Sequence, residues 1–301
     1  MNEQIYTECP KYETESFILR LVDMDDAEEL LECYSDKLAV DKMNADNCTS
    51  NFYFQTVEEM KECISFWLDL YKKQCFVRFS VIEKQTQNAV GTIEIFGGEY
   101  GVLRIDLCTK YEEPKYIEEL IRIAIYDFVR DFEIQNLEIK AINTPGRMPL
   151  LEKYGFVPST TFRPGSGYYE RRYMQYFFKE KGIAYCGLAC CVCSENKNCA
   201  GCRNEGCIEK DWCKSFNCCK SKKIDGCWEC KEFPCDNPMF KKLRVIAFAN
   251  FIAEFGEDKL IEGLKQNEQK GMLYHYTDKL VGDYDLVTNE EELIKILQNG
   301  I

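Results

Sequence analysis

Cysteine is concentrated in one part of this chain, at spacings that could bind a metal. Thirteen of the 19 cysteines lie between residues 186 and 235. Two C-x-x-C pairs and one C-x-x-x-C-x-x-C triple stand there, with single cysteines beside them, and such turns bring thiolates together. The predicted metal ligands are Cys186, Cys190, Cys193, Cys199, Cys202, Cys213, Cys218, Cys227, Cys230 and Cys235.

The expected compartment favours metal over disulfides. The first 20 residues contain no apolar run typical of a signal peptide, and no stretch approaches the ~18 apolar residues of a membrane span. The six other cysteines are scattered, as reduced thiols are in a cytosol. We therefore expect a cytoplasmic protein, no membrane contact and a metal-bound cysteine segment.

The identity of the metal stays open at this point. All-sulfur ligation suits zinc and also an iron–sulfur cluster, and the sequence favours zinc. Ten ligands would fill two four-coordinate sites and leave two thiols free or bridging. The single histidine, His275, follows the cysteine segment by 40 residues, and we expect it to be a surface residue rather than a ligand.

The charge of the chain argues against nucleic acid as a partner. The formal net charge is −13, and binding to nucleic acid requires a positive footprint. An acidic surface would suit a cationic amine, although it also favours solubility alone. A protein partner cannot be identified from these features.

Strand and helix signals alternate through the first 180 residues and predict an α+β fold with a mostly antiparallel sheet. Thr56 and Glu59 form a capping box, and Pro114 precedes a long helix with a buried apolar stripe. The predicted strands are 16–22, 75–84, 89–96, 102–109, 137–143 and 168–178, and the predicted helices are 26–34, 56–73, 115–132 and 149–154.

The last 60 residues predict helices without site chemistry. The expected helices are 239–255, 258–269 and one capped by Thr288 with Glu291 that runs to Leu297. We expect the first of these to pack against the cysteine segment or the sheet. The predicted domains are 1–180, 181–238 (cysteine-rich, metal-binding) and 239–301 (helical extension).

Three segments of the first domain carry a family resemblance. Residues 13–20 read ETESFILR, residues 90–95 read VGTIEI and residues 150–156 read LLEKYGF. They resemble the GNAT superfamily of acetyl-CoA-dependent N-acetyltransferases, in particular the branch that acts on protein N-termini and antibiotics. The resemblance spans most of residues 13–178 and implies acetyl-CoA as co-substrate and a small-molecule or peptide amine as acceptor.

The resemblance also implies roles for particular residues. Glu94 and Asp106 lie mid-strand where the family places a general base. The family's proton donor to the leaving thiolate would align with Leu151, which has no proton to give, and the candidate Tyr154 follows three residues later on a different helical face. The alternative leaves both carboxylates exposed on a sheet face. The implied coenzyme contacts are Leu107, Cys108, Thr109, Lys115, Tyr116 and Asn143.

The turn that should bind the coenzyme pyrophosphate departs from the family pattern. Lys115 and Ile117 replace glycines, Pro114 has no N–H to donate, and Glu112 and Glu113 place negative charges beside the expected phosphates. Two functions therefore stay open. The chain is either an N-acetyltransferase with an appended metal module or a non-catalytic scaffold for metal-dependent binding or redox and metal sensing.

The cysteine segment resembles a second family. Residues 186–190 read CGLAC, residues 199–202 read CAGC and residues 227–235 read CWECKEFPC. These motifs resemble a cysteine-rich domain family of bacteria and archaea whose function is unknown. Cys191, Cys207 and Cys219 fall outside its pattern.

Overall fold

The chain is described from a computed structural model that covers residues 3–45, 51–96, 100–142, 144, 146–173, 177–196, 198–208 and 210–300. It divides into two compact units, Met1–Arg172 and Tyr173–Ile301. The cysteine segment and the C-terminal helices lie in the same unit, and the predicted division into three domains stays a prediction.

The first unit is built on one eight-stranded sheet, which confirms the predicted α+β class. The strand order is β1-β2-β3-β4-β5-β6-β8-β7, and among the described strands β5 and β6 alone pair in parallel. The strands are β1 Tyr12–Glu13, β2 Phe17–Leu21, β3 Phe76–Glu83, β4 Ala89–Phe96, β5 Tyr100–Leu107, β6 Asn136–Lys140, β7 Val157–Pro158 and β8 Tyr168–Arg172.

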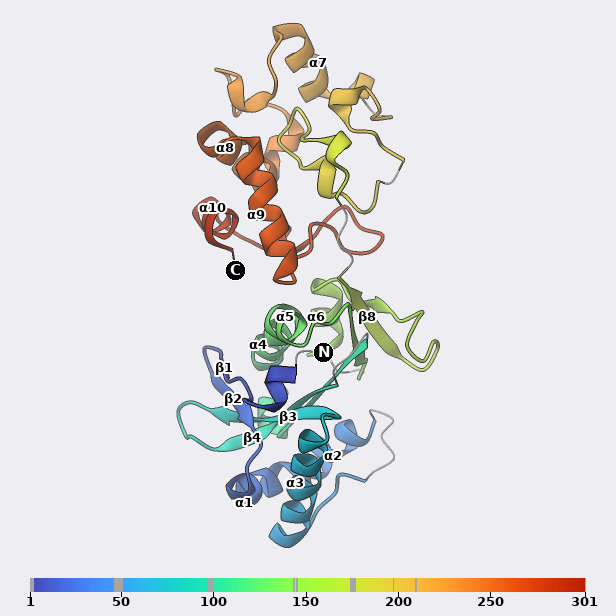
Figure 1. Cartoon of the computed structure of the whole chain (residues 1–301), viewed down its shortest axis with the longest axis vertical. Helices are drawn as coiled ribbons and strands as arrows, with labels where there is room; N and C mark the ends of the chain where they lie inside the picture. Colours follow the sequence, from blue (N-terminus) through green and yellow to red (C-terminus); the bar gives the residue numbers. More distant parts are fainter. Residues whose placement is uncertain are drawn as a thin grey trace. The chain divides into compact units, whose positions relative to one another are not determined.

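Helices cover both faces of this sheet (Figure 1). On one face lie α1 Ala27–Ser35, α2 Lys37–Asn44 and α3 Val57–Lys72. On the other lie α4 Pro114–Ile123, α5 Val129–Asp131 and α6 Met148–Lys153, with a π-helical turn at Ala124–Phe128 between the first two.

Local sequence signals explain where several of these helices begin. The Thr56 side chain accepts from the backbone N–H of Glu59, and the Glu59 carboxylate accepts from the backbone of Thr56, which is the predicted capping box of α3. Pro114 occupies the first turn of α4, where a missing N–H costs nothing. The predicted helix 115–132 is thus present, divided by the π-helical turn.

The second unit combines an irregular cysteine segment with a helical part. Its helices are α7 Lys214–Lys222, α8 Leu243–Phe255, α9 Glu257–Gln269 and α10 Glu290–Asn299, and the last three pack on one another. Gly187 approaches α8 closely, since a Cβ there would lie 3.1 Å from the backbone nitrogen of Ala249. The predicted packing of this first apolar helix against the cysteine segment is therefore confirmed.

One capping prediction was wrong. The helix α10 is capped by Asn289, whose side chain accepts from the N–H of Glu292, and not by Thr288 with Glu291. Both residues are good N-caps, so the box motif alone does not fix the register.

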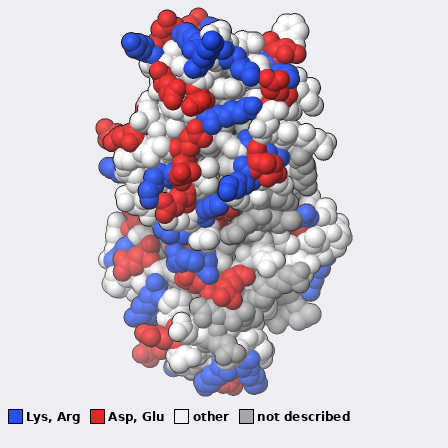
Figure 2. Space-filling model, turned by 45° about the horizontal axis from the view of Figure 1, so that its top comes forward, with Lys and Arg blue, Asp and Glu red and all other residues white. Residues whose placement is uncertain are grey.

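Charged side chains of both signs are mixed on the surface that Figure 2 shows. Figure 2 shows Lys and Arg interspersed with Asp and Glu, so the net negative charge is not gathered in one area of the face drawn. Among the described helices, none is both long enough and apolar enough to cross a membrane.

Candidate functional site

A network of charged side chains lies on one face of β3, β4 and β5. In the strand register Arg78 stands opposite Glu94, and Glu94 opposite Arg104. Two residues further along these strands, and therefore on the same face, Thr92 stands opposite Asp106. Because directly paired residues project from the same face of a sheet, these side chains meet as a group.

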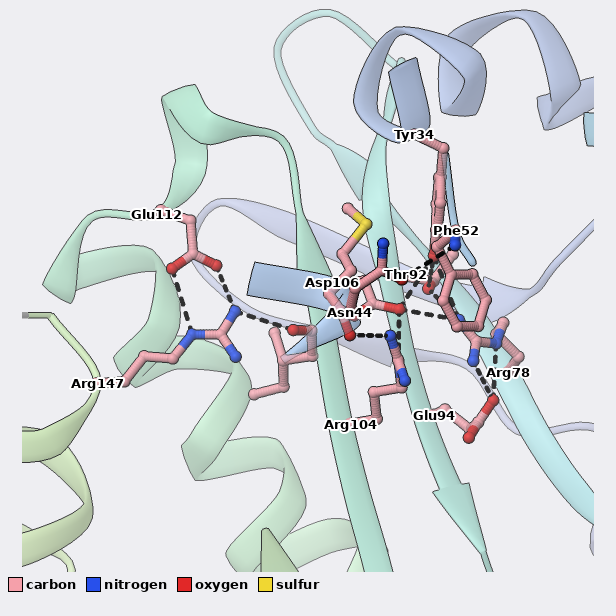
Figure 3. A network of polar contacts seen from close by, with 12 residues as sticks. Tyr34, Asn44, Phe52, Arg78, Thr92, Glu94, Arg104, Asp106, Glu112 and Arg147 are labelled. Atoms are coloured by element: carbon pink, nitrogen blue, oxygen red, sulfur yellow. Dashed lines mark hydrogen bonds and ion pairs between the residues drawn. The ribbon is translucent and has the colours of Figure 1, made fainter. Parts of the chain in front are cut away.

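Ion pairs join the group (Figure 3). The Arg78 guanidinium donates through Nε to Glu94 Oε2 at 2.8 Å and also through Nη2, and its Nη1 lies 3.1 Å from Asp106 Oδ2. Asp106 Oδ2 further accepts from Arg104 Nε at 2.7 Å and from the Tyr34 hydroxyl at 3.2 Å. Each of these side chains is buried.

Aromatic rings of the helical layer cover the two guanidinium groups. The Arg78 guanidinium carbon lies 4.1 Å from the ring centre of Trp67, and that of Arg104 lies 4.3 Å from the ring centre of Phe52. Cation–π contact adds to the Coulomb attraction here.

The two predicted general bases are therefore not exposed on a sheet face, and the alternative that placed them there was wrong. Glu94 is 5% and Asp106 2% exposed. Burial by itself would raise the pKa of Asp106, but the Arg104 and Arg78 charges outweigh it, so that the pKa is lowered. Protonation of Asp106 would break several charged contacts, which makes this carboxylate a weak proton acceptor.

A gap opens between β5 and β6. Their parallel pairing ends at Leu103 with Ile139, whereas β5 continues in register with β4 as far as Leu107. The carbonyl oxygen of Ile105, on this unpaired stretch, accepts from Arg147 Nη2 at 2.9 Å. The guanidinium of Arg147 thus takes the place of a strand partner.

Arg147 is also paired with Glu112, which corrects the expectation that this glutamate places a free charge at the start of α4. Arg147 Nε lies 3.2 Å from Glu112 Oε2, and Nη2 donates to Oε1 (Figure 3). Both side chains are 5% exposed, and Lys42 Nζ lies 3.9 Å from the same carboxylate. Glu113 remains exposed at the helix start, 3.7 Å from Lys115 Nζ.

The first turn of α4 does not form the glycine cradle that binds a pyrophosphate. Pro114 has no N–H, and the N–H groups of Tyr116 and Ile117 both bond to the carbonyl of Glu113. Ile117 is fully buried, and a Cβ at Gly146 would lie 3.3 Å from its Cδ1. In this form the turn does not fit a diphosphate, and a cation would have to replace the backbone donors.

The described residues predicted to contact the coenzyme lie at the end of β5, in the turn that follows it and at the start of α4. Leu107 pairs with Gly91, the Thr109 hydroxyl donates to Asp36, and Cys108 packs against the core beneath α1–α3. The Lys115 side chain is exposed, and the Tyr116 ring packs against Phe17 and Tyr111. Asn143 lies outside the described residues.

Tyr154 lies at the end of α6 and contacts α4. Its hydroxyl donates to Glu118 Oε1 at 2.6 Å, and Lys153 Nζ lies 2.6 Å from the same oxygen. Burial and the Glu118 carboxylate raise the pKa of Tyr154, so its hydroxyl is protonated at neutral pH.

In the second unit, half of the ten predicted metal ligands belong to one packed cluster: Cys186, Cys202 and Cys227 are buried in it, and Cys190 and Cys213 pack against it. Within the segment we distinguish a first group around Cys190, whose pKa is raised by burial and further by the neighbouring thiols. Those neighbours are Cys202, Cys186, Cys199 and Cys193. Cys213 packs against the same cluster as Cys186 and Cys202, and Cys227 of the pocket described next belongs to that cluster as well.

The second group lines a pocket of about 230 Å³. Its cysteines are Cys218, Cys219, Cys227, Cys230 and Cys235. Cys219 Sγ lies 3.7 Å from Cys227 Sγ, and Lys222 Nζ lies 3.2 Å from Cys230 Sγ. The contact with Cys219, together with Ser215 and Lys222, lowers the pKa of Cys227 to about 7.

Both groups have a donor set that fits a soft metal. All cysteines of the described ranges are free thiols. Within those ranges, three or more Cys, His, Asp or Glu side chains are not gathered tightly enough to hold an ion. Thiolate ligands suit zinc or an iron–sulfur centre, and the two groups name the residues that would hold one.

His275 is partly buried and contacts Cys193 of the first group, so it is less exposed than expected. Its Nδ1 lies 3.5 Å from Cys193 Sγ, and its Nε2 lies 3.4 Å from Nη2 of Arg244. Three features of the site were not predicted: the contact of His275 with Cys193, the pair of Arg147 with Glu112, and the place of Cys219 in the pocket. No local sequence signal marks them.

Comparison with known proteins gives one family match. A family described as a protein of unknown function (DUF3795) matches residues 194–239, which contain seven of the ten predicted ligands. This match agrees with the resemblance of the cysteine segment to a family of unknown function. No curated protein matches the chain.

Solved acetyltransferase structures align with about half of the chain. One, a GNAT-family acetyltransferase from Bacillus anthracis, has 18% identity and a TM-score of 0.40, covering 54% of this chain and 98% of its own. A ribosomal-protein-S5-alanine acetyltransferase from Vibrio fischeri has 15% identity and a TM-score of 0.40, covering 54% and 96%. An acetyl transferase from Salmonella typhimurium that modifies the N-terminal serine of L7/L12 has 10% identity and a TM-score of 0.40, covering 53% and 96%.

Proposed function

We propose that this chain is an acetyl-CoA-dependent N-acetyltransferase of the GNAT type with an appended cysteine module that binds metal. The observation that carries the acetyltransferase proposal is the gap between β5 and β6, with the Ile105 carbonyl and the Arg147 guanidinium directed into it. Beyond Leu103 β5 is not paired with β6, and this edge would take up an extended acyl-CoA chain beside the Ile105 carbonyl, which Arg147 occupies. Arg147 offers a cation for its phosphates, and a guanidinium is a strong phosphate ligand.

In this proposal Glu112 competes with the phosphates for Arg147. A phosphate that takes the guanidinium leaves the Glu112 carboxylate with the more distant Lys42 ammonium, at 3.9 Å, as its ion-pair partner. Removal of the Glu112 charge should therefore favour a phosphate-bearing ligand.

The roles of the other predicted residues follow from their contacts. Tyr154 would donate its proton to the leaving thiolate, with Glu118 orienting the hydroxyl. Glu94 and Asp106 would hold the sheet together through Arg78 and would not act as general bases. The acceptor would be a small-molecule or peptide amine.

Calorimetric titration with acetyl-CoA tests this proposal. We expect weak binding by the unaltered protein, and binding by Glu112→Gln that is tighter by about tenfold, which equals ~1.4 kcal/mol. Glu113→Gln is the matched control, because this neighbour is exposed and has no contact with Arg147. The double variant Glu112→Gln/Arg147→Gln removes both charges, keeps two amides of similar shape and should lose the gain.

If Glu112→Gln and the double variant bind acetyl-CoA equally well, Arg147 is not the phosphate ligand. If the unaltered protein already binds tightly, the phosphates lie elsewhere on the domain.

A second candidate is a non-catalytic GNAT-like scaffold for a metal-dependent binding or sensing protein. The closed first turn of α4 and the saturated contacts of Asp106 favour it. It predicts no acetyl-CoA binding by the unaltered protein, by Glu112→Gln or by the double variant, while the metal content stays unchanged.

The metal part of the proposal rests on the two groups of thiols. We propose one metal centre in each group, zinc in preference to iron–sulfur. Elemental analysis of protein purified without oxygen should find about two metal ions per chain, and the absorption spectrum should lack the brown colour of an iron–sulfur cluster. Metal-free protein with disulfides by mass spectrometry would contradict this part alone.

A further inference from the structure

His275, the single histidine of the chain, lies between a cysteine and an arginine. Its Nδ1 is 3.5 Å from Cys193 Sγ, and its Nε2 is 3.4 Å from Nη2 of Arg244. The two ring nitrogens therefore face groups of opposite hydrogen-bonding character.

The partners of the ring determine where its proton lies. A guanidinium carries donors and no acceptor, so Nε2 must present its lone pair to Arg244. A neutral imidazole has one N–H, which is then on Nδ1 and points at the sulfur of Cys193. A sulfur that receives an N–H is a better acceptor as a thiolate than as a thiol.

Further contacts fix the Arg244 side chain, so the fold determines its position beside His275. Its side chain is 3% exposed, its Nη1 lies 3.0 Å from the Tyr274 carbonyl oxygen, and Asp285 Oδ2 lies 2.9 Å from the same Nη1. A second contact ties this segment to the cysteines, because the N–H of Ala189 donates to the Tyr274 hydroxyl at 2.9 Å.

We propose that His275 is a positioning residue of the metal module, which donates its Nδ1–H to the thiolate of Cys193. This inference rests on the proposed metal function. Cys193 belongs to the C-x-x-x-C-x-x-C triple with Cys186 and Cys190, whose sulfurs would carry several negative charges once they bind a metal. An N–H directed at one sulfur offsets part of that charge and fixes the direction of its lone pairs.

The geometry argues against His275 as a direct metal ligand. Metal on Nδ1 would leave the proton on Nε2, where it would face the Nη2 donor of Arg244. Two donors pointing at each other are repulsive. The residue therefore acts on the metal through Cys193 and not by coordination.

Nitrogen NMR of the intact, metal-loaded protein tests the proton position directly. Selective labelling of histidine with ¹⁵N gives the signals of one imidazole, because the chain has one histidine. We expect a protonated Nδ1 and an unprotonated Nε2. A protonated Nε2, with Nδ1 bound to metal or free, would overturn the inference without any substitution.

Two variants test the consequence for the metal. His275→Phe removes the donor and should lower metal affinity by roughly 10–100-fold, measured by competition with a chelator. His275→Asn keeps a short N–H donor and should recover part of that loss. Equal metal affinity of His275→Phe and the unaltered protein would refute the positioning role. Absence of metal from the unaltered protein would instead refute the proposed metal function, before any variant is compared.

Discussion

Replacing Asp106 with asparagine distinguishes a structural role of the buried network from a catalytic one. Asp106 accepts from the guanidinium groups of Arg78 and Arg104 and from the Tyr34 hydroxyl, and it is 2% exposed. Without its charge, Glu94 is the remaining carboxylate between the two arginines of the network. One buried cation is then uncompensated.

The expected loss is large. Breaking a buried ion pair by removal of one partner costs about 3–5 kcal/mol of unfolding free energy. For a unit of this size, that corresponds to a melting temperature lower by roughly 6–20 °C. Scanning calorimetry of the full chain should show this shift in the transition of the sheet unit.

The control is a surface pair of similar chemistry. Asp69 lies 3.4 Å from Lys72 Nζ and its side chain is 58% exposed, so Asp69→Asn should change the unfolding free energy by less than about 1 kcal/mol. If Asp106→Asn melts like the unaltered protein but has lost acetyl transfer, Asp106 is a catalytic base and the structural account is wrong.

Three further predictions follow from the same contacts. Because the pKa of Asp106 is lowered in the folded state, its stabilisation is present above the unfolded pKa of ~3.9 and is lost as pH falls toward the folded value, so acid titration should destabilise the unaltered protein more than Asp106→Asn. Tyr154→Phe should lower acetyl transfer by about 10²–10⁴-fold with little loss of stability, and equal rates would exclude Tyr154 as the proton donor. Strong chelation at neutral pH should expose residues 181–235 to protease while the sheet unit resists, because the proposed thiolate–metal bonds would contribute most of the stability of this segment. Uniform cleavage of both units would contradict that reasoning.

The sequence predicted the elements whose signals are local. The capping box of α3, the three-strand meander and the start of α4 at Pro114 each depend on residues a few positions apart. The helix α2 was missed: it is eight residues long and follows α1 after the single residue Asp36, which caps it. Of the predicted strand 168–178, β8 covers Tyr168–Arg172, where its pairing with β6 ends, and residues 174–176 lie outside the described part of the chain.

The candidate site could be predicted only in part, because its decisive contacts are distant in sequence. Glu112 and Arg147 are 35 residues apart, and Cys193 and His275 are 82 apart. Glu112 considered alone predicts a charge that repels the coenzyme phosphates. Arg147 lies beside it and compensates that charge. The cysteine motifs named the thiols but could not show which of them lie close together, since that depends on how the segment folds against α8.

Acetyl transfer itself is the most direct test of the central claim. The full chain would be incubated with acetyl-CoA and a set of peptides with free N-terminal amines, and mass spectrometry would record acetylated peptide beside released coenzyme A thiol. We predict transfer by the unaltered protein, faster transfer by Glu112→Gln at low acetyl-CoA, and loss of that gain in the Glu112→Gln/Arg147→Gln variant. Folded protein that transfers no acetyl group in any of these forms would contradict the claim and leave the scaffold as the function of this domain.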